Sequence, residues 1–284
     1  MNISHFIVEN EAQVRIGFFL GVLIIMGLWE LKKPRREATV SKLSRWINNL
    51  GLIFFNSFVL KILLPITSTA TAALALENNW GLFNIYEVSP FISVVLFVII
   101  MDLIIYLQHV MVHAVPLLWR LHRVHHADLD YDVTTGARFH TLEIILSMFI
   151  KLTAIVLLGP SIFAVILFEI ILNVSAMFNH GNVGLPKTLD KVLRYIIVTP
   201  DMHRVHHSIE EDETNSNFGF NLTWWDKIFG TYKNEVRKGQ LKMTIGLKNI
   251  RNPKKTNRIW GMLVLPFSEK VDVYMINSKK QKDI

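Results

Sequence analysis

Histidine is the residue type whose placement in this 284-residue chain most strongly indicates chemistry. Ten of the eleven histidines, all except His5, lie between residues 109 and 207. Residues three or four positions apart share one face of a helix, so histidines at that spacing can direct their rings to one point. Eight histidines have this spacing, in one HxxxH pair and two HxxHH trios: His109 and His113; His122, His125 and His126; and His203, His206 and His207.

These histidine groups predict a site for two metal ions. Neutral imidazole is the commonest metal ligand among side chains, and unpaired imidazoles are costly in an apolar chain beside a membrane. Zinc prefers four ligands, so eight grouped histidines are more than one such ion takes. Carboxylates are scarce around the groups, unlike in the soluble bundles where glutamates hold two irons. The chain has no cysteine, which excludes thiolate ligands and disulfides.

The elements that must position the histidines are apolar runs of spanning length. Hydrophobic residues make up 51% of the chain and charged residues 19%, and the mean hydropathy is +0.34. Soluble domains usually carry about 25% charged residues, so this composition favours a membrane protein. The runs lie at 14–31, 46–65, 90–113, 142–158 and 161–178. Because Gly159-Pro160 separates the last two, we interpret them as a helical hairpin in the bilayer; a hairpin buried in a protein core is the alternative.

The charges in the loops predict an orientation. Residues 32–45 contain six lysines and arginines, whereas residues 66–89 contain none. The positive-inside rule places 32–45 in the cytoplasm, the N-terminus outside and the C-terminus in the cytoplasm. The net charge of +7 indicates anionic lipid head groups as partners rather than nucleic acid. We therefore expect an all-α, multi-pass membrane protein with about four transmembrane helices, including the hairpin, and a cytoplasmic helical cap that holds the histidine-rich di-metal site.

The order and spacing of the histidine groups resemble those of the fatty acid hydroxylase (sterol desaturase) superfamily of membrane di-iron oxygenases. Segments 138–143 (RFHTLE), 179–182 (NHGN), 214–219 (TNSNFG) and 225–231 (WDKIFGT) are also similar to that family. Thr141 stands where the family usually has proline. We accordingly expect three regions: an N-terminal membrane anchor with two spans at 1–90, a catalytic region at 91–232 and a basic C-terminal tail at 233–284.

The resemblance implies an oxidoreductase of lipid or sterol metabolism that uses O2 and external electrons to hydroxylate or desaturate a lipid C–H bond. Its cofactor would be two iron ions, its co-substrate O2, and its active site would face the cytoplasm. The electrons would come from a separate cytochrome, ferredoxin or reductase, since no GxGxxG motif occurs in the chain. By position, the metal ligands implied are His109, His113, His122, His125, His126, His140, His180, His203, His206 and His207.

Other classes of protein fit the sequence less well. An acyl desaturase commonly begins with HxxxxH, an intramembrane zinc hydrolase shows HExxH, and a bis-histidine haem carrier places its paired histidines inside the spans. A non-catalytic di-metal lipid-binding protein of the membrane is the alternative function. Iron-dependent consumption of O2 would separate the enzyme from that alternative.

Charged residues near the groups give three further expectations. Residues 185–198 have the pattern of an amphipathic helix along the cytoplasmic interface, with packing against the cap as the alternative. Lys151 and Glu169 lie nine residues on either side of Pro160, so we expect them to face each other within the hairpin. Carboxylates often orient ligand imidazoles, and the candidates for this role, together with a tyrosine on the same face as His109, are Asp102, Asp128, Asp201, Asp226 and Tyr106.

Overall fold

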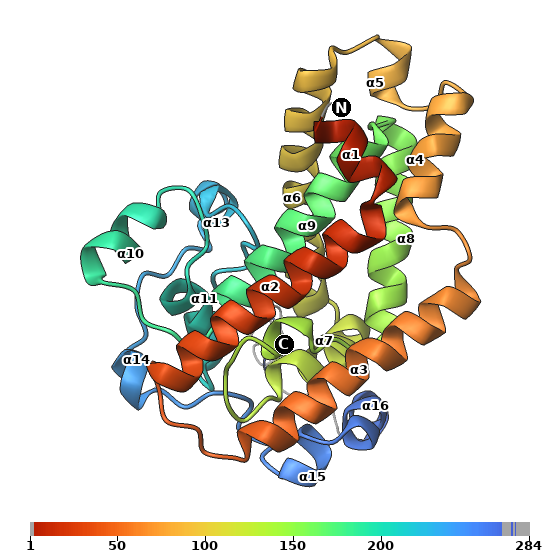
Figure 1. The fold of residues 1–284 in the computed structure, drawn as a ribbon. Helices are drawn as coiled ribbons and strands as arrows, with labels where there is room; N and C mark the ends of the chain where they lie inside the picture. Colours follow the sequence, from red (N-terminus) through yellow and green to blue (C-terminus); the bar gives the residue numbers. More distant parts are fainter. Residues whose placement is uncertain (1–2, 269–273, 275, 277–284) are drawn as a thin grey trace, which may run out of the picture.

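The computed structural model describes residues 3–268, Tyr274 and Ile276, and this part of the chain is helical, with isolated β-bridges and no strand (Figure 1). Within it, five helical segments are long and apolar enough to cross a membrane. They comprise α2 (Glu11–Lys32), α3 (Lys42–Leu63), α6 (Pro90–Ala114), α8 (Thr141–Leu158) and α9 (Ile162–Asn179). The all-α fold class predicted from the sequence is confirmed.

The hairpin of α8 and α9 forms at the predicted break. Gly159 ends α8 in the left-handed conformation, with φ of 65°, which favours glycine. Ser161 then caps α9, because its side chain accepts a hydrogen bond from the amide of Ala164. The turn reverses the direction of the chain between the two helices, and both contact α6.

The two charges predicted to meet in this hairpin do so. Lys151 Nζ lies 3.2 Å from Glu169 Oε1. Arg15 on α2 forms a second ion pair with Glu169, and the hydroxyl of Ser68 donates to the same carboxylate at 2.9 Å. Ser68 begins α4 (Ser68–Glu77), which together with α5 (Leu82–Ile85) links α3 to α6. The carboxylate thus joins four helices, and the sequence had indicated two of them.

Short helices form a lobe at one end of the long ones (Figure 1). α7 (Pro116–His126) carries the first histidine trio, and α11 (Pro200–His206) with its C-cap His207 carries the second. η1 (Thr135–Ala137) precedes α8. The other helices of the lobe are α10 (Lys187–Leu193), α12 (Glu211–Thr214), α13 (Trp224–Ile228), α14 (Gly239–Lys242), α15 (Pro253–Thr256) and α16 (Ile259–Ser268). The short helix α1 (Ile3–Glu9) lies at the other end of the long helices, where it contacts α9 (Figure 1).

The described part of the predicted C-terminal tail is packed against this lobe. α16 lies on α7, and Met262 and Leu265 are buried with Trp119 in one apolar cluster. Residues 233–268 are therefore part of the folded unit that surrounds the histidines. Apart from Tyr274 and Ile276, the remainder of the predicted tail lies outside the described residues.

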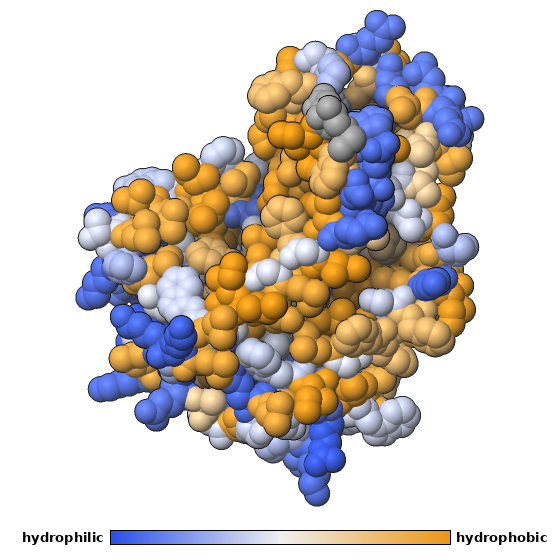
Figure 2. Space-filling model, in the orientation of Figure 1, coloured by the Kyte–Doolittle hydropathy of each residue, from blue (hydrophilic) through white to orange (hydrophobic). Residues whose placement is uncertain are grey.

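Large apolar side chains cover the outer faces of the long helices. Figure 2 shows hydrophobic residues across α2 and α3, where Phe18, Phe54 and Phe58 are exposed. A contiguous apolar surface of this kind is suited to contact with lipid. In and directly after α10, the apolar side chains of Leu189, Val192 and Ile196 are also exposed. A helix at a membrane interface requires such an exposed apolar face. That residues 185–198 lie at a membrane surface stays a prediction.

The predicted orientation can be tested by labelling single cysteines, since the chain has none of its own. Asn78 and Lys33 are both exposed, and they lie on opposite sides of the membrane in our prediction. A membrane-impermeant maleimide applied to intact cells should label Asn78→Cys directly and Lys33→Cys only after permeabilisation. The reverse pattern would contradict the orientation.

Candidate metal centre

Nine of the ten histidines singled out from the sequence come together, in two buried groups. Within each group, one nitrogen from every ring lies within 4.8 Å of those of the others. The first group holds His109, His113, His122, His126 and His206. The second holds His125, His180, His203 and His207.

Each HxxHH trio is divided between the two groups. On α7, the outer pair His122 and His126 joins the first group, and His125 joins the second. On α11 the division is reversed, because His203 and His207 join the second group and His206 joins the first. The i and i+4 positions share a face of the helix, whereas the intervening position points to one side of it. Two short helices therefore contribute to both groups, and the groups lie side by side.

Hydrogen-bond acceptors next to Nδ1 fix the orientation of three imidazole rings in the first group. Nδ1 of His109 lies 2.8 Å from the carbonyl oxygen of Phe218, and Nδ1 of His206 lies 2.8 Å from that of Ser216. Nδ1 of His122 lies 2.6 Å from Glu143 Oε1. Because carbonyl and carboxylate oxygens accept, these Nδ1 atoms donate, and in each neutral ring Nε2 carries the lone pair.

Two imidazole rings of the second group are also oriented by backbone carbonyls that accept hydrogen bonds from Nδ1. Nδ1 of His180 donates to the carbonyl of Ala176 at 2.7 Å, and Nδ1 of His125 donates to that of Arg138 at 3.3 Å. Their Nε2 atoms then face each other at 3.2 Å, and Nε2 of His203 lies 3.1 Å from Nε2 of His180. Lone pairs brought this close in a buried site repel each other unless a cation lies between them.

The residues present fit metal ions. Four Nε2 atoms are buried without any hydrogen-bond partner among the described residues, those of His109, His122, His206 and His207. Imidazole nitrogens bind zinc at about 2.0–2.1 Å, so two of them at a right angle on one ion are about 3 Å apart. The separations of 3.1 and 3.2 Å in the second group match that spacing. Neutral nitrogen donors without thiolates suit iron, zinc and copper.

Burial keeps these imidazoles in the form that binds metal. Desolvation lowers the pKa of His180 to about 4 and that of His206 to about 3. For His125, His203 and His207, desolvation together with the neighbouring histidines holds the pKa well below 6.5. All five rings are therefore neutral at pH 7 and have a lone pair available.

His140, the tenth predicted ligand, lies outside both groups. Its ring caps the start of α8, where Nδ1 accepts a hydrogen bond of 3.2 Å from the amide of Leu142. Nε2 of the same ring lies 3.2 Å from the carbonyl oxygen of Leu263 in α16. Both nitrogens are thus engaged with the backbone, and the structure does not bring this ring to the other nine.

The carboxylate beside a histidine is Glu143, which the sequence did not single out for this role. Its position three residues after His140 in the RFHTLE segment was the available signal, and at the start of α8 its carboxylate lies beside His122. Two of the predicted carboxylates act elsewhere. Asp102 accepts from the amides of Asn221 and Leu222 and from the indole of Trp225, and Asp201 pairs with Arg35 and Arg204.

Asp226 orients a ligand through the backbone. Its carboxylate accepts hydrogen bonds of 2.8 Å from the amides of Phe218 and Gly219. The carbonyl of Phe218 in turn accepts from His109, and Asn215 in the same loop lies 3.2 Å from Nδ1 of His113. Tyr106 does not contact an imidazole through its hydroxyl, which lies 2.9 Å from that of Thr231. The similar segments 214–219 and 225–231 thus form one support for the first group.

Asp128 belongs to a buried ion network beside the second group. Arg45 on α3 donates to Asp128 at 2.7 and 2.8 Å and also pairs with Asp132. Burial alone would raise the pKa of Asp128, but Arg45 and Arg138 hold it at about 2. Arg138 is the residue whose carbonyl accepts from His125. The network therefore ties α3 to the segment that orients this ring.

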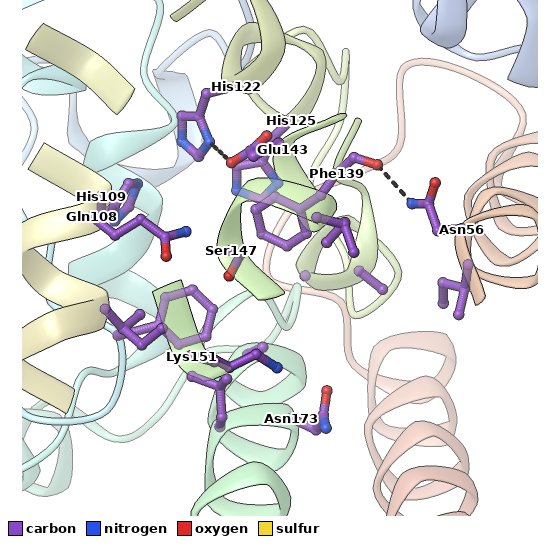
Figure 3. A pocket seen from close by; sticks show the side chains of 18 of the residues that line it. Asn56, Gln108, His109, His122, His125, Phe139, Glu143, Ser147, Lys151 and Asn173 are labelled. Atoms are coloured by element: carbon purple, nitrogen blue, oxygen red, sulfur yellow. Dashed lines mark hydrogen bonds and ion pairs between the residues drawn. The ribbon is translucent and has the colours of Figure 1, made fainter. Parts of the chain in front are cut away.

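A cavity of about 270 Å³ reaches the first and second groups from the membrane helices (Figure 3). Its metal-side wall includes His109, His122 and His125. Apolar side chains of α2, α3, α6 and α9 form much of the remainder, including Phe19, Ile53, Leu60, Ile105 and Leu172. A molecule in this cavity would be in contact both with histidines of the candidate metal centre and with apolar surface.

This arrangement defines an α-helical protein with apolar, membrane-length helices and a buried, histidine-rich centre suited to two metal ions. Residues 94–231 match the family model described as fatty acid hydroxylase, so this part of the chain is similar to that family. No solved structure matches the chain significantly.

Two relatives are named as enzymes that act on lipids. The chain is 28% identical to the alkylglycerol monooxygenase of Homo sapiens over 238 residues, which cover 81% of this chain and 49% of the relative. It is 28% identical to the ornithine lipid hydroxylase OlsE of Rhizobium tropici over 190 residues, 67% of this chain and 55% of the relative. The matched part thus spans about half the length of each relative.

A substitution at Gly136 tests the support of the second group. A Cβ here would lie 2.5 Å from the carbonyl oxygen of Ala176 and 3.1 Å from Nδ1 of His180. Gly136→Ala should separate these two hydrogen-bonded groups, and we expect the metal bound per chain to fall by about half. Gly17→Ala on α2 is the control, since its Cβ meets nothing within 4 Å. Equal metal content in both variants would contradict this role of the Gly136 backbone.

The ion network predicts a large loss of stability in Arg45→Met. This change leaves Asp128 and Asp132 buried without their main partner, and breaking one side of a buried ion pair costs about 3–5 kcal/mol. Because the pKa of Asp128 is lowered in the fold, the stability it contributes is present at neutral pH and is lost only as pH falls toward about 2. Chemical unfolding in detergent at pH 7 measures the loss. Lys61→Met, on an exposed site of the same helix, should change the free energy of unfolding by about 0.5 kcal/mol or less.

Proposed function

We propose that this protein is a multi-pass membrane di-iron monooxygenase that hydroxylates a C–H bond of a lipid. In this proposal, nine histidines hold the two irons, and residues 91–232 form the catalytic region. His109, His113, His122, His126 and His206 bind one ion, and His125, His180, His203 and His207 bind the other. The observation that carries the proposal is the set of buried Nε2 atoms that converge without partners at one end of an apolar cavity.

The chemistry of the donor set supports iron. Redox metals with open coordination positions, when bound here, would supply the activation of O2 that an unreactive C–H bond requires. The protein's own residues orient and protect the site. Glu143, Phe218 and Ser216 hold the ligand rings by their Nδ1 atoms, and the buried lobe excludes bulk water. The apolar cavity walls hold a hydrocarbon chain against the histidines.

The names of the relatives support a lipid substrate. One is a monooxygenase of alkylglycerols and the other a hydroxylase of ornithine lipids, so we infer hydroxylation rather than desaturation. Two electrons per turnover would come from a separate protein on the side of the lobe, which we assign to the cytoplasm from the loop charges.

Transfer of isotopically labelled O2 into lipid tests this function. Iron-loaded protein, a chemical reductant and a membrane lipid extract should yield a lipid that gains one labelled oxygen, detected by mass spectrometry. His203→Asn should abolish the product, because it removes one proposed ligand. His140→Asn should retain most of it, because asparagine is also a good helix N-cap and this position lies outside both groups.

The outcome separates the two functions considered from the sequence. Labelled product that depends on His203 supports the monooxygenase. Iron and lipid bound tightly by the wild-type protein without any labelled product would contradict it and favour a non-catalytic lipid-binding protein.

A further inference from the structure

One wall of the cavity carries a line of polar groups within the membrane helices. Glu143, Ser147 and Lys151 follow each other at intervals of four residues on α8, and all three line the cavity. Residues at this spacing share a helix face. In Figure 3, His122 and Glu143 lie at one end of the view and Lys151 and Asn173 toward the other. Lys151 lies eight positions after Glu143 on the helix, a rise of about 12 Å.

A cavity for a plain hydrocarbon would not need these groups. Charged residues at membrane depth are costly and usually mark a ligand or ion pathway. Apolar side chains on the other helices also line the cavity, including Phe19 on α2 and Ile53 and Leu60 on α3. Polar groups outside α8 line it as well: Asn56 and Ser57 on α3, Gln108 on α6 and Asn173 on α9. Exposed Phe18 and Phe54 cover the outer faces of the same two helices. The cavity thus lies between the lipid-facing helices and the histidines, and Lys151 is the one lysine or arginine among its lining residues.

The ion pair with Glu169 leaves N–H groups of the Lys151 ammonium available for a ligand. Among the described residues, Glu169 is the hydrogen-bond partner found for Nζ, at 3.2 Å, and an ammonium group has three hydrogens to donate. Glu169 also has Arg15 and Ser68 as partners, and Arg15 is itself paired with Glu11 at 2.9 Å. The carboxylate therefore keeps two other hydrogen-bond partners besides Lys151. Of the two cations on Glu169, Lys151 lines the cavity, and Arg15 is not among the lining residues.

We propose that Lys151 is a binding residue for the lipid and determines which lipids the cavity accepts. Its free N–H groups bind oxygen atoms of the lipid's polar group, a carboxylate, a phosphate or a neutral oxygen function, at the end of the cavity remote from the histidines. The carbon to be oxidised then lies at a fixed distance from that group, about 12 Å along α8. This inference rests on the proposed function and names the substrate class: a lipid with hydrogen-bond-accepting oxygens at that spacing.

Equilibrium binding tests the inference without turnover. The probes are radiolabelled hexadecanoate, hexadecyl phosphate, hexadecanol and hexadecane, each bound to the iron-loaded protein in detergent. Lys151→Met should weaken binding of at least one oxygen-bearing probe about tenfold and leave hexadecane unchanged, as expected from the loss of one hydrogen bond to a charged group. Lys151→Gln keeps N–H donors without the charge. It should restore binding of hexadecanol if the oxygen is neutral, and should fail to restore hexadecanoate or hexadecyl phosphate if it is anionic.

Arg15→Met is the matched control. It removes the other cation on Glu169, so a merely structural role for Lys151 predicts equal losses in both variants. The proposal predicts that Arg15→Met binds every probe within about twofold of wild type, and size-exclusion profiles and iron content verify that both variants are folded. Equal losses in the two variants, or wild-type affinity of Lys151→Met for all probes, would overturn it. The binding assay uses neither O2 nor electrons, so its result does not depend on whether the monooxygenase assay succeeds.

Discussion

The burial of nine imidazoles around two points is the constraint on which the rest of the structure depends. In the second group, desolvation keeps the rings neutral, and their nitrogens face each other at about the spacing that ligands of one ion have. That arrangement is unfavourable without a cation, and the fold must hold every ring against the repulsion. Glu143 and the carbonyls of Phe218, Ser216, Ala176 and Arg138 do this by accepting from Nδ1.

The supports behind those acceptors explain why distant segments pack on the lobe. Asp226 fixes the loop that contains Phe218, and Asp102 on α6 fixes the next stretch through the amides of Asn221 and Leu222. Arg45 reaches from α3 to Asp128 near the second group. The long helices therefore anchor the centre as well as provide its apolar cavity, and Glu169 ties their far parts together.

The spacing of residues in the sequence predicted the features that depend on helix periodicity and on single turns. The i, i+3 and i+4 histidines, the break at Gly159 and the meeting of Lys151 with Glu169 all follow from helix periodicity and one turn. The sequence could not predict contacts between segments far apart in the chain. Arg15 reaches Glu169 across 154 positions, and Glu143 reaches His122 because a loop folds α8 back beneath α7. His140 was grouped with the ligands by its motif, but its place at the N-terminus of α8 turns its ring toward the backbone.

The central claim is that these nine histidines hold two irons, and metal analysis combined with X-ray absorption tests it most directly. Protein purified without oxygen should contain close to two irons per chain, with a first coordination shell dominated by imidazole nitrogen and without sulfur. One iron per chain, or a shell dominated by carboxylate oxygen, would contradict the account.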